Sequence, residues 1–320
     1  MYTPKDLKNE GQHIFFKLLS FVIYSNLLYV VLLFLTVMLY AKITGEYSSV
    51  ESIINQLDTR FFTILNEISV TIIGIGLFFR NKEFLIQEFK TVNRHFSTIN
   101  FILYLFLLVC FSILGTGILH FSSINLEGYF NTINSKSPLS LIFIIVIAPV
   151  IEEILFRGVV LKPLEKYGKL LAIVISSLLF AIYHGNIIQG IYAFICGLLL
   201  GFVASEYSLK YSVILHIFNN LISTIIENKP FTELYKNHFA NTSVMIISAF
   251  FCSMVHTRKI SCFKELFKSK QTCFWRRIQN MPSIITGYTI CCNMFTSNIH
   301  LNQKGSLSLL RDKEPFYYFL

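Results

Sequence analysis

The sequence predicts an all-α, polytopic membrane protein with about eight transmembrane helices, and two observations predict this class. Of the 320 residues, 54% are apolar and only 14% are charged, whereas soluble domains carry about 25% charged residues. The apolar residues are also gathered in long runs, and a helix needs about 20 mostly apolar residues to cross a bilayer. Much of the chain is therefore expected to lie in lipid.

Eight apolar segments are candidate spanning helices. The first is too long for a cleavable signal peptide, so we expect it to remain as an anchor. Short polar loops separate most of the others. The segments are 14–41, 60–80, 98–121, 139–161, 168–186, 187–206, 210–226 and 241–256.

Lysine and arginine residues flank these segments on alternate sides. Because cytoplasmic loops are enriched in Lys and Arg, both termini are predicted to be cytoplasmic. The net charge of +9 then reflects orientation in the membrane, and we expect no nucleic-acid partner. The cation-rich side comprises Lys5, Lys8, Lys17, Arg80, Lys82, Lys90, Arg94, Lys162, Lys166, Lys169, Lys210 and a tail cluster at 258–277.

Small residues recur every four positions in the segment 187–206, at Ala193, Gly197, Gly201 and Ser205. Small side chains let a neighbouring helix approach closely. We interpret this stripe as a packing seam.

Three polar motifs interrupt the apolar pattern, each in a different predicted helix. An ionisable side chain in a spanning helix costs at least about 2.5 kcal/mol, so it marks a functional site or a buried pair. The motifs are Glu152-Glu153-x-x-x-Arg157, Phe180-x-x-x-His184 and His216-x-x-x-Asn220.

The two adjacent glutamates are predicted to have different roles. Successive helical residues are about 100° apart, so Glu152 and Glu153 are not expected to face the same neighbour. Glu153 and Arg157 have the four-residue spacing of a same-face ion pair. That pair would leave Glu152 without a local cation, and a desolvated carboxylate of this kind can act as a general base near neutral pH.

The histidines and asparagines are interpreted by their spacing. His216 and Asn220 lie one turn apart on one face, where they could supply two neutral donors to a developing oxyanion. Asn219 points about 100° away and is predicted to be a packing residue. His184, taken alone, fits a hydrogen-bonded packing residue as well as a catalytic group.

The three motifs, in this order, resemble those of the CPBP intramembrane proteases. This family includes the type II CAAX prenyl endopeptidases and bacteriocin-processing or immunity proteins, and the resemblance covers about residues 139–226. It implies that Glu152 and His184 activate a water for attack on a peptide carbonyl, and that His216 and Asn220 stabilise the oxyanion. Supporting roles fall to Glu153, Arg157 and Phe180.

The resemblance implies an intramembrane endopeptidase with a catalytic cavity inside the helical bundle, which acts on a membrane-associated peptide or protein. Two other functions stay open: a non-catalytic bacteriocin-immunity or peptide-binding protein of the same fold, and a proton-relay transporter. The soluble zinc motif HExxH is absent, so we expect no required cofactor. Zinc held by Glu152, His184 and His216 is the alternative.

The chain then divides into four parts. Residues 1–138 hold the first three helices, 139–226 the CPBP-like catalytic core, 227–256 the last transmembrane helix and 257–320 a basic cytoplasmic tail. The tail either lies on an anionic membrane surface or has no ordered role. Abundant Phe, Ile, Asn and Lys are typical of AT-rich coding, which favours a bacterial plasma membrane.

Depth along the helices predicts a distortion. Counted from the cation-rich helix ends, Glu152, His184 and His216 lie about 15, 22 and 9 Å deep at a rise of roughly 1.5 Å per residue. Straight helices would therefore scatter the site. Because Pro149 removes a helix hydrogen bond and Gly185 follows His184, we predict broken or tilted helices around a water-filled cavity.

Overall fold

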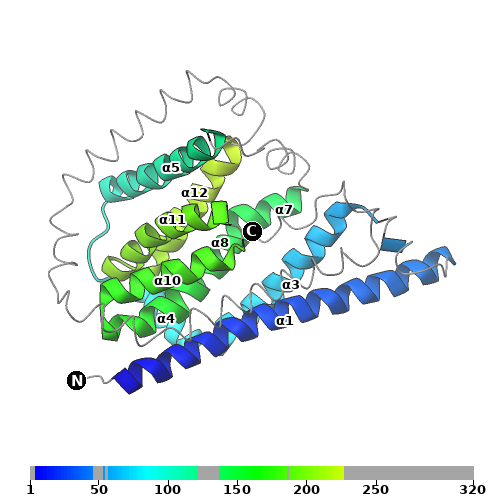
Figure 1. The fold of residues 1–320 in the computed structure, drawn as a ribbon, viewed down its shortest axis with the longest axis horizontal. Helices are drawn as coiled ribbons and strands as arrows, with labels where there is room; N and C mark the ends of the chain where they lie inside the picture. Colours follow the sequence, from blue (N-terminus) through cyan, green and yellow to red (C-terminus); the bar gives the residue numbers. More distant parts are fainter. Residues whose placement is uncertain (1–3, 46–52, 55–56, 122–136, 186, 227–320) are drawn as a thin grey trace.

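The computed structural model describes residues 4–45, 53–54, 57–121, 137–185 and 187–226. Within these ranges all regular structure is helical, which confirms the predicted all-α class for this part of the chain (Figure 1). Outside one long composite helix, the elements are α1 (Pro4–Thr44), α3 (Thr59–Arg80), α4 (Lys82–Lys90), α5 (Thr98–Phe121), α10 (Lys169–Tyr183), α11 (Ile187–Glu206) and α12 (Leu209–Ile226).

The composite helix, which we call the central helix, runs from Pro138 to Tyr167 without interruption. Its N-terminus is capped by Ser137, whose hydroxyl accepts from the backbone N–H of Ser140, and Pro138 stands in the first turn, where its missing N–H costs nothing. Its successive segments are α7 (Pro138–Ile142), η1 (Phe143–Ile147), α8 (Ala148–Glu152), η2 (Glu153–Leu161), α9 (Lys162–Leu164) and η3 (Glu165–Tyr167).

Two of these segments, η1 and η2, are π-helical, with hydrogen bonds from residue i to i+5. The predicted distortion of this helix is therefore present as widened turns, and the helix continues through Pro149 without a break. The helix α10 ends at Tyr183, so His184 is its C-cap. Gly185 follows with a φ of 64°, which a glycine adopts readily.

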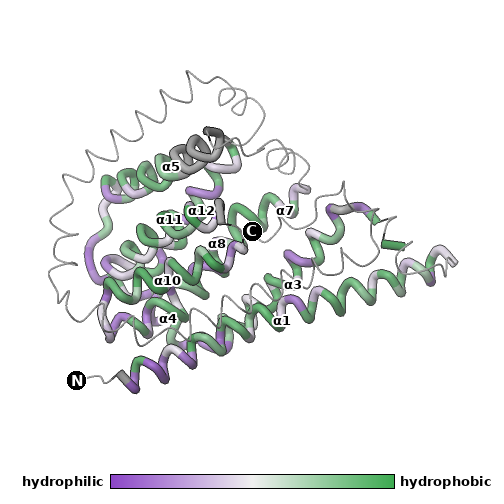
Figure 2. Tube along the Cα trace, in the orientation of Figure 1, coloured by the Kyte–Doolittle hydropathy of each residue, from purple (hydrophilic) through white to green (hydrophobic). Residues whose placement is uncertain are grey.

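Four described helices are long and apolar enough to cross a membrane, namely Lys5–Thr44, Arg60–Arg80, Pro138–Tyr167 and Gln189–Glu206. Apolar residues cover most of α1 and α3 in Figure 2. Shorter apolar helices occupy Thr98–Phe111 and Lys169–Tyr183. The predicted segment 241–256 and the tail lie outside the described residues, so the count of eight helices stays a prediction.

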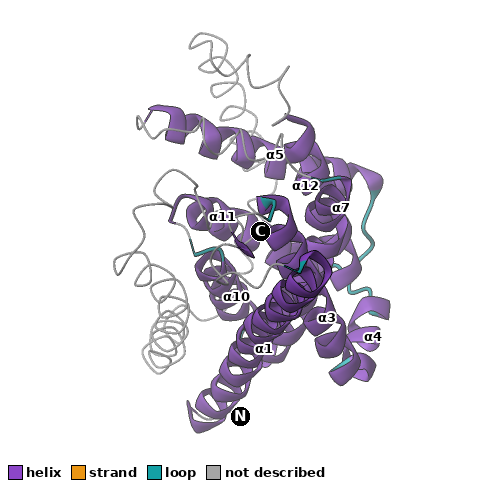
Figure 3. Cartoon of the chain, turned by 90° about the vertical axis from the view of Figure 1, so that its right-hand side faces the viewer, coloured by secondary structure: helices purple, strands orange, loops and turns teal. Residues whose placement is uncertain are grey.

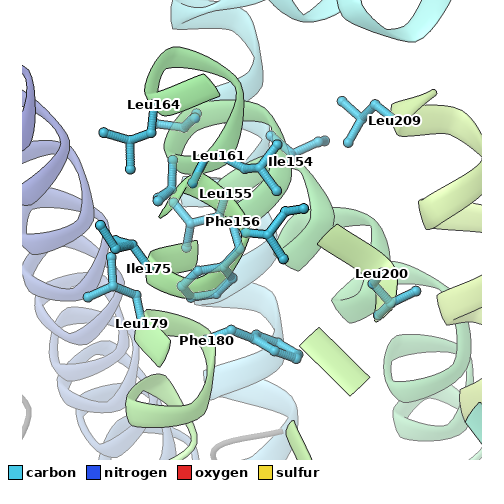
Figure 4. Packing of buried hydrophobic residues seen from close by; sticks show 14 of the residues in the cluster. Ile154, Leu155, Phe156, Leu161, Leu164, Ile175, Leu179, Phe180, Leu200 and Leu209 are labelled. Atoms are coloured by element: carbon cyan, nitrogen blue, oxygen red, sulfur yellow. The ribbon is translucent and has the colours of Figure 1, made fainter. Parts of the chain in front are cut away.

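The central helix is surrounded by the others. α1 and α3 lie on one side of the bundle and α5 on the opposite side, with α10, α11 and α12 between them (Figures 1 and 3). Figure 4 shows its side chains interleaved with those of its neighbours. The rings of Phe156 and Phe180, for example, are 5.2 Å apart between centroids. The middle of the central helix, Ile151–Leu161, is buried throughout.

The stripe of small residues on α11 is a packing seam, as predicted. A Cβ added at Gly197 would lie 3.1 Å from the Cβ of Ser177 on α10, and one at Gly201 would lie 3.2 Å from a methyl group of Leu161. These glycines let α11 approach α10 and the central helix closely.

Ion pairs join the helices at the cation-rich end of the bundle. Lys166 contacts Glu10 of α1 at 2.5 Å, and Lys169 contacts Glu206 of α11 at 2.9 Å. Lys162 lies 3.4 Å from Glu88 of α4. The predicted cations of 162–169 thus lie at one end with acidic partners, while their side of the membrane stays a prediction.

Candidate active site

Three helices supply the predicted site residues. The central helix carries Glu152, Glu153 and Arg157, which are at most 5% exposed. α12 carries His216, which is also 5% exposed, and the half-buried Asn220. α10 carries the buried Phe180 and ends on the half-buried His184.

Glu153 is the most fully bonded carboxylate of this group. Its Oε1 lies 3.1 Å from Nη1 of Arg157 and accepts from Nδ1 of His216 at 3.0 Å. Its Oε2 accepts from the hydroxyl of Ser212 at 2.5 Å. The predicted Glu153–Arg157 ion pair is confirmed, and Glu153 is held as an anionic acceptor.

Both glutamates face His216, so the expectation that they cannot face the same neighbour was wrong. Nδ1 of His216 contacts Glu153, while Nε2 lies 3.5 Å from Oε2 of Glu152. An imidazole has two nitrogens on separate edges, so one ring can stand between two side chains that leave their helix in different directions. Adjacent carboxylates thereby share one partner.

The contacts of His216 also assign its tautomer. A carboxylate paired with arginine only accepts hydrogen bonds, so Nδ1 of His216 carries the hydrogen that Glu153 receives. In the neutral ring, Nε2 then carries the lone pair, 3.5 Å from Oε2 of Glu152. Neutral His216 is therefore an acceptor at Nε2, and it becomes a donor there only as the imidazolium.

Phe180 lies at the centre of the group. Its ring centroid is 4.7 Å from that of His184, 5.9 Å from that of His216 and 4.6 Å from the guanidinium carbon of Arg157. An aromatic face attracts a guanidinium at this distance. The ring therefore links the two histidines to the buried cation.

His184 is oriented by its own helix. Its Nδ1 lies 2.8 Å from the carbonyl oxygen of Phe180, and because a carbonyl only accepts, Nδ1 carries the hydrogen and Nε2 is left with a lone pair. Among the described residues no hydrogen bond joins His184 directly to Glu152. The two are connected through Phe180 and His216.

Asn220 is bonded to the central helix. Its Nδ2 donates to the carbonyl oxygen of Ile144 at 3.0 Å. The backbone N–H of Ala148 donates to the carbonyl oxygen of Phe143. In the same i→i+5 pattern the carbonyl oxygen of Ile144 would accept from Pro149, which has no N–H. Pro149 thus frees the carbonyl of Ile144, and Asn220 satisfies it. One of the two amide hydrogens of Asn220 is used in this bond.

Two contacts of α12 could not be predicted from the motifs. Asn219 donates to the hydroxyl of Tyr192 at 3.0 Å, which agrees with its predicted packing role. Ser212, which bonds Glu153, stands one turn before His216 in the row Ser212, His216 and Asn220. The four-residue spacing of this row was the available signal for Ser212.

The residues do not fit a zinc site as they stand. Zinc in a catalytic site needs three protein donors around one point. In the part of the chain that the structure describes, no three His, Cys, Asp or Glu side chains are grouped to hold a metal ion. Glu152, His184 and His216 therefore do not form such a set.

Part of the chain matches a known protein family. Residues 134–222 match the family described as Rce1-like, type II CAAX prenyl endopeptidase Rce1-like. No protein of curated function and no solved structure matches the chain.

The matched residues include every residue of the three motifs. The long apolar helices and the match to a membrane protease family identify the chain as a membrane protein. Over residues 134–222 the chain is similar to the Rce1-like type II CAAX prenyl endopeptidases, which confirms the resemblance to the CPBP intramembrane proteases.

Proposed function

We propose that the chain is an intramembrane endopeptidase that hydrolyses a peptide bond of a membrane-associated peptide or protein. The observation that carries the proposal is the buried contact of His216 with Glu152 and Glu153, within a segment that matches a protease family. Buried carboxylates and imidazoles are costly in a membrane helix and are kept there for function.

In the proposed reaction Glu152 acts as the general base. A water held between Glu152 and His184 gives a proton to Glu152, and its oxygen attacks the peptide carbonyl carbon. Glu152 passes this proton to the lone pair on Nε2 of His216, which lies 3.5 Å from its Oε2. The tetrahedral oxyanion then accepts from Nε2–H, while Nδ1–H stays on Glu153. Collapse of the intermediate breaks the C–N bond, and the proton returns from Nε2 through Glu152 to the leaving amine.

Asn220 has a smaller part in this scheme. Its bond to Ile144 supports a role in holding α12 against the central helix. Its second amide hydrogen remains available to the oxyanion beside His216. Arg157 and Phe180 act on the geometry, because they contact Glu153 and His216.

The proposal includes no metal, since the donors are not grouped to hold one. The lipid bilayer is the working environment, and we propose a bacterial plasma membrane with both termini cytoplasmic. The clustering of Lys162, Lys166 and Lys169 with acidic partners, among them Glu10 near the start of α1, supports the cytoplasmic N-terminus, because such cations mark the cytoplasmic side.

The test is cleavage by the full chain reconstituted in vesicles of phosphatidylethanolamine and phosphatidylglycerol. The probes are two quenched fluorescent peptides, one with a farnesylated CAAX end and one with an unprenylated hydrophobic segment. We expect Glu152→Gln and His184→Ala each to lower kcat by about 10²–10⁴-fold, the usual contribution of a general base. A zinc chelator is expected to leave the rate unchanged.

The matched controls are Glu83→Gln and His95→Ala, which remove an exposed carboxylate and an exposed imidazole outside the site. Both should cleave at the parent rate. Unchanged cleavage in Glu152→Gln and in His184→Ala would disprove the peptidase mechanism, and loss of activity on chelation would disprove the metal-free version.

A further inference from the structure

Ser212 is a buried polar residue that none of the three motifs contains. It lies on α12, one turn before His216, and it is 0% exposed. Its hydroxyl oxygen lies 2.5 Å from Oε2 of Glu153 and 3.0 Å from the carbonyl oxygen of Leu200. Both neighbours are acceptors.

A hydroxyl has one hydrogen to donate, so Ser212 can fully satisfy only one of these two oxygens. Bonds to an ionised carboxylate are shorter and stronger than bonds to a carbonyl. The shorter contact is the one to Glu153. The hydrogen of Ser212 is therefore directed to the carboxylate.

This bond has a particular effect because the two oxygens of Glu153 are held differently. Oε1 is contacted by Arg157 and His216, whereas Ser212 supplies the hydrogen bond to Oε2. The terminal torsion of a glutamate is broad and nearly two-fold. Without the serine, the carboxylate can rotate while Arg157 still neutralises its charge.

Rotation of the Glu153 carboxylate would change which nitrogen of His216 carries the hydrogen. With Oε1 fixed, Nδ1 of His216 has an acceptor and keeps its hydrogen, so Nε2 faces Glu152 with a lone pair. With the carboxylate free to turn, that preference weakens and the other tautomer becomes populated. Its Nε2–H would then donate to Glu152.

We propose that Ser212 is a positioning residue, which locks Glu153 so that His216 keeps its hydrogen on Nδ1 and presents Nε2 to Glu152. This proposal rests on the proposed peptidase. It assigns the serine a function through Glu153 and His216, with no contact to the substrate.

The experiment compares Ser212→Ala with Ser212→Thr, which keeps the hydroxyl, and with Ser177→Ala as the matched control. Ser177 is equally buried, but its hydroxyl bonds the carbonyl of Ile173 in its own helix. Cleavage of the two fluorescent peptides gives kcat and KM. Nitrogen-15 spectra of labelled histidine, with His216→Asn to assign the signal, report the tautomer.

We expect Ser212→Ala to lower kcat by about 10- to 100-fold, as a small misplacement of a reacting group does, with KM unchanged. The His216 signal should change from one Nδ1–H tautomer to a mixture. Ser212→Thr should restore both, and Ser177→Ala should alter neither. If Ser212→Ala does not fold, Ser212→Cys serves instead, because a thiol is a weak donor of similar size.

A kcat within twofold of the parent in Ser212→Ala, or an unchanged nitrogen-15 signal, would overturn the proposal. These outcomes differ from failure of the peptidase itself, which would appear as full activity in Glu152→Gln. The tautomer measurement needs no cleavage, so it tests the serine even if neither peptide is a substrate.

Discussion

Replacing Arg157 with methionine removes the cation that neutralises Glu153. The two charges lie 3.1 Å apart and are both 0% exposed. At an effective dielectric constant near 20, their attraction is about 5 kcal/mol. Because the change strands a buried carboxylate, we expect Arg157→Met to lower the free energy of unfolding by about 3–5 kcal/mol.

A double-mutant cycle isolates this pair. Glu153→Gln in the Arg157→Met background removes the stranded charge, so the double variant should lose less stability than the two single variants together. We expect a coupling energy of about 2–3 kcal/mol, at the upper end for residues in contact. The assay is unfolding by sodium dodecyl sulfate in mixed micelles, followed by circular dichroism.

The control is the exposed pair Arg60–Asp58. Nη2 of Arg60 lies 2.6 Å from Oδ2 of Asp58, and the two side chains are 61% and 49% exposed. Arg60→Met should leave the unfolding curve unchanged, because solvent screens such pairs. If Arg157→Met also leaves the curve unchanged, the inference that Glu153 is anionic and neutralised by Arg157 is refuted.

Two further predictions concern packing, and the same unfolding assay measures both. Gly197→Ala should cost about 1–2 kcal/mol, because the new methyl meets Ser177 at 3.1 Å and overpacking outweighs the gain in helix propensity. A Cβ at Gly76 would meet nothing within 4 Å, so Gly76→Ala should raise the free energy of unfolding by about 0.5–1 kcal/mol. If Gly197→Ala and Gly76→Ala changed stability equally, the packing seam at Gly197 would be contradicted. Leu85→Ala should cost about 2–5 kcal/mol because Leu85 is 0% exposed and leaves a cavity. Phe84→Ala, at 39% exposure, should stay within about 0.5 kcal/mol, and a similar loss in both would argue against burial of α4.

The helices of this chain were largely predictable because lipid imposes a simple rule on composition. Apolar length alone predicted 98–121 and 187–206, and the structure has helices with these bounds. The ion pair between Glu153 and Arg157 followed from a spacing of four, which acts within one helix. Such local features need no knowledge of the neighbouring elements.

The contacts between helices were less predictable. Which nitrogen of His216 meets which glutamate depends on how α12 lies against the central helix, and residue spacing within either helix does not contain that information. The bond from Asn220 to Ile144 is of the same kind, since its acceptor is a backbone atom that no motif records. Serine is also common in membrane helices, so Ser212 gave little signal by itself.

The nine-residue segment η2 changes how the central helix should be compared with related sequences. A π-helix bonds i to i+5 where an α-helix bonds i to i+4, so each residue advances through a smaller angle. A helical wheel drawn at about 100° per residue therefore loses phase first in η1 and then, over a longer stretch, beyond Glu152. Lipid-facing and buried positions before and after η2 belong to two separate wheels, and a substitution pattern averaged over the whole helix would blur both.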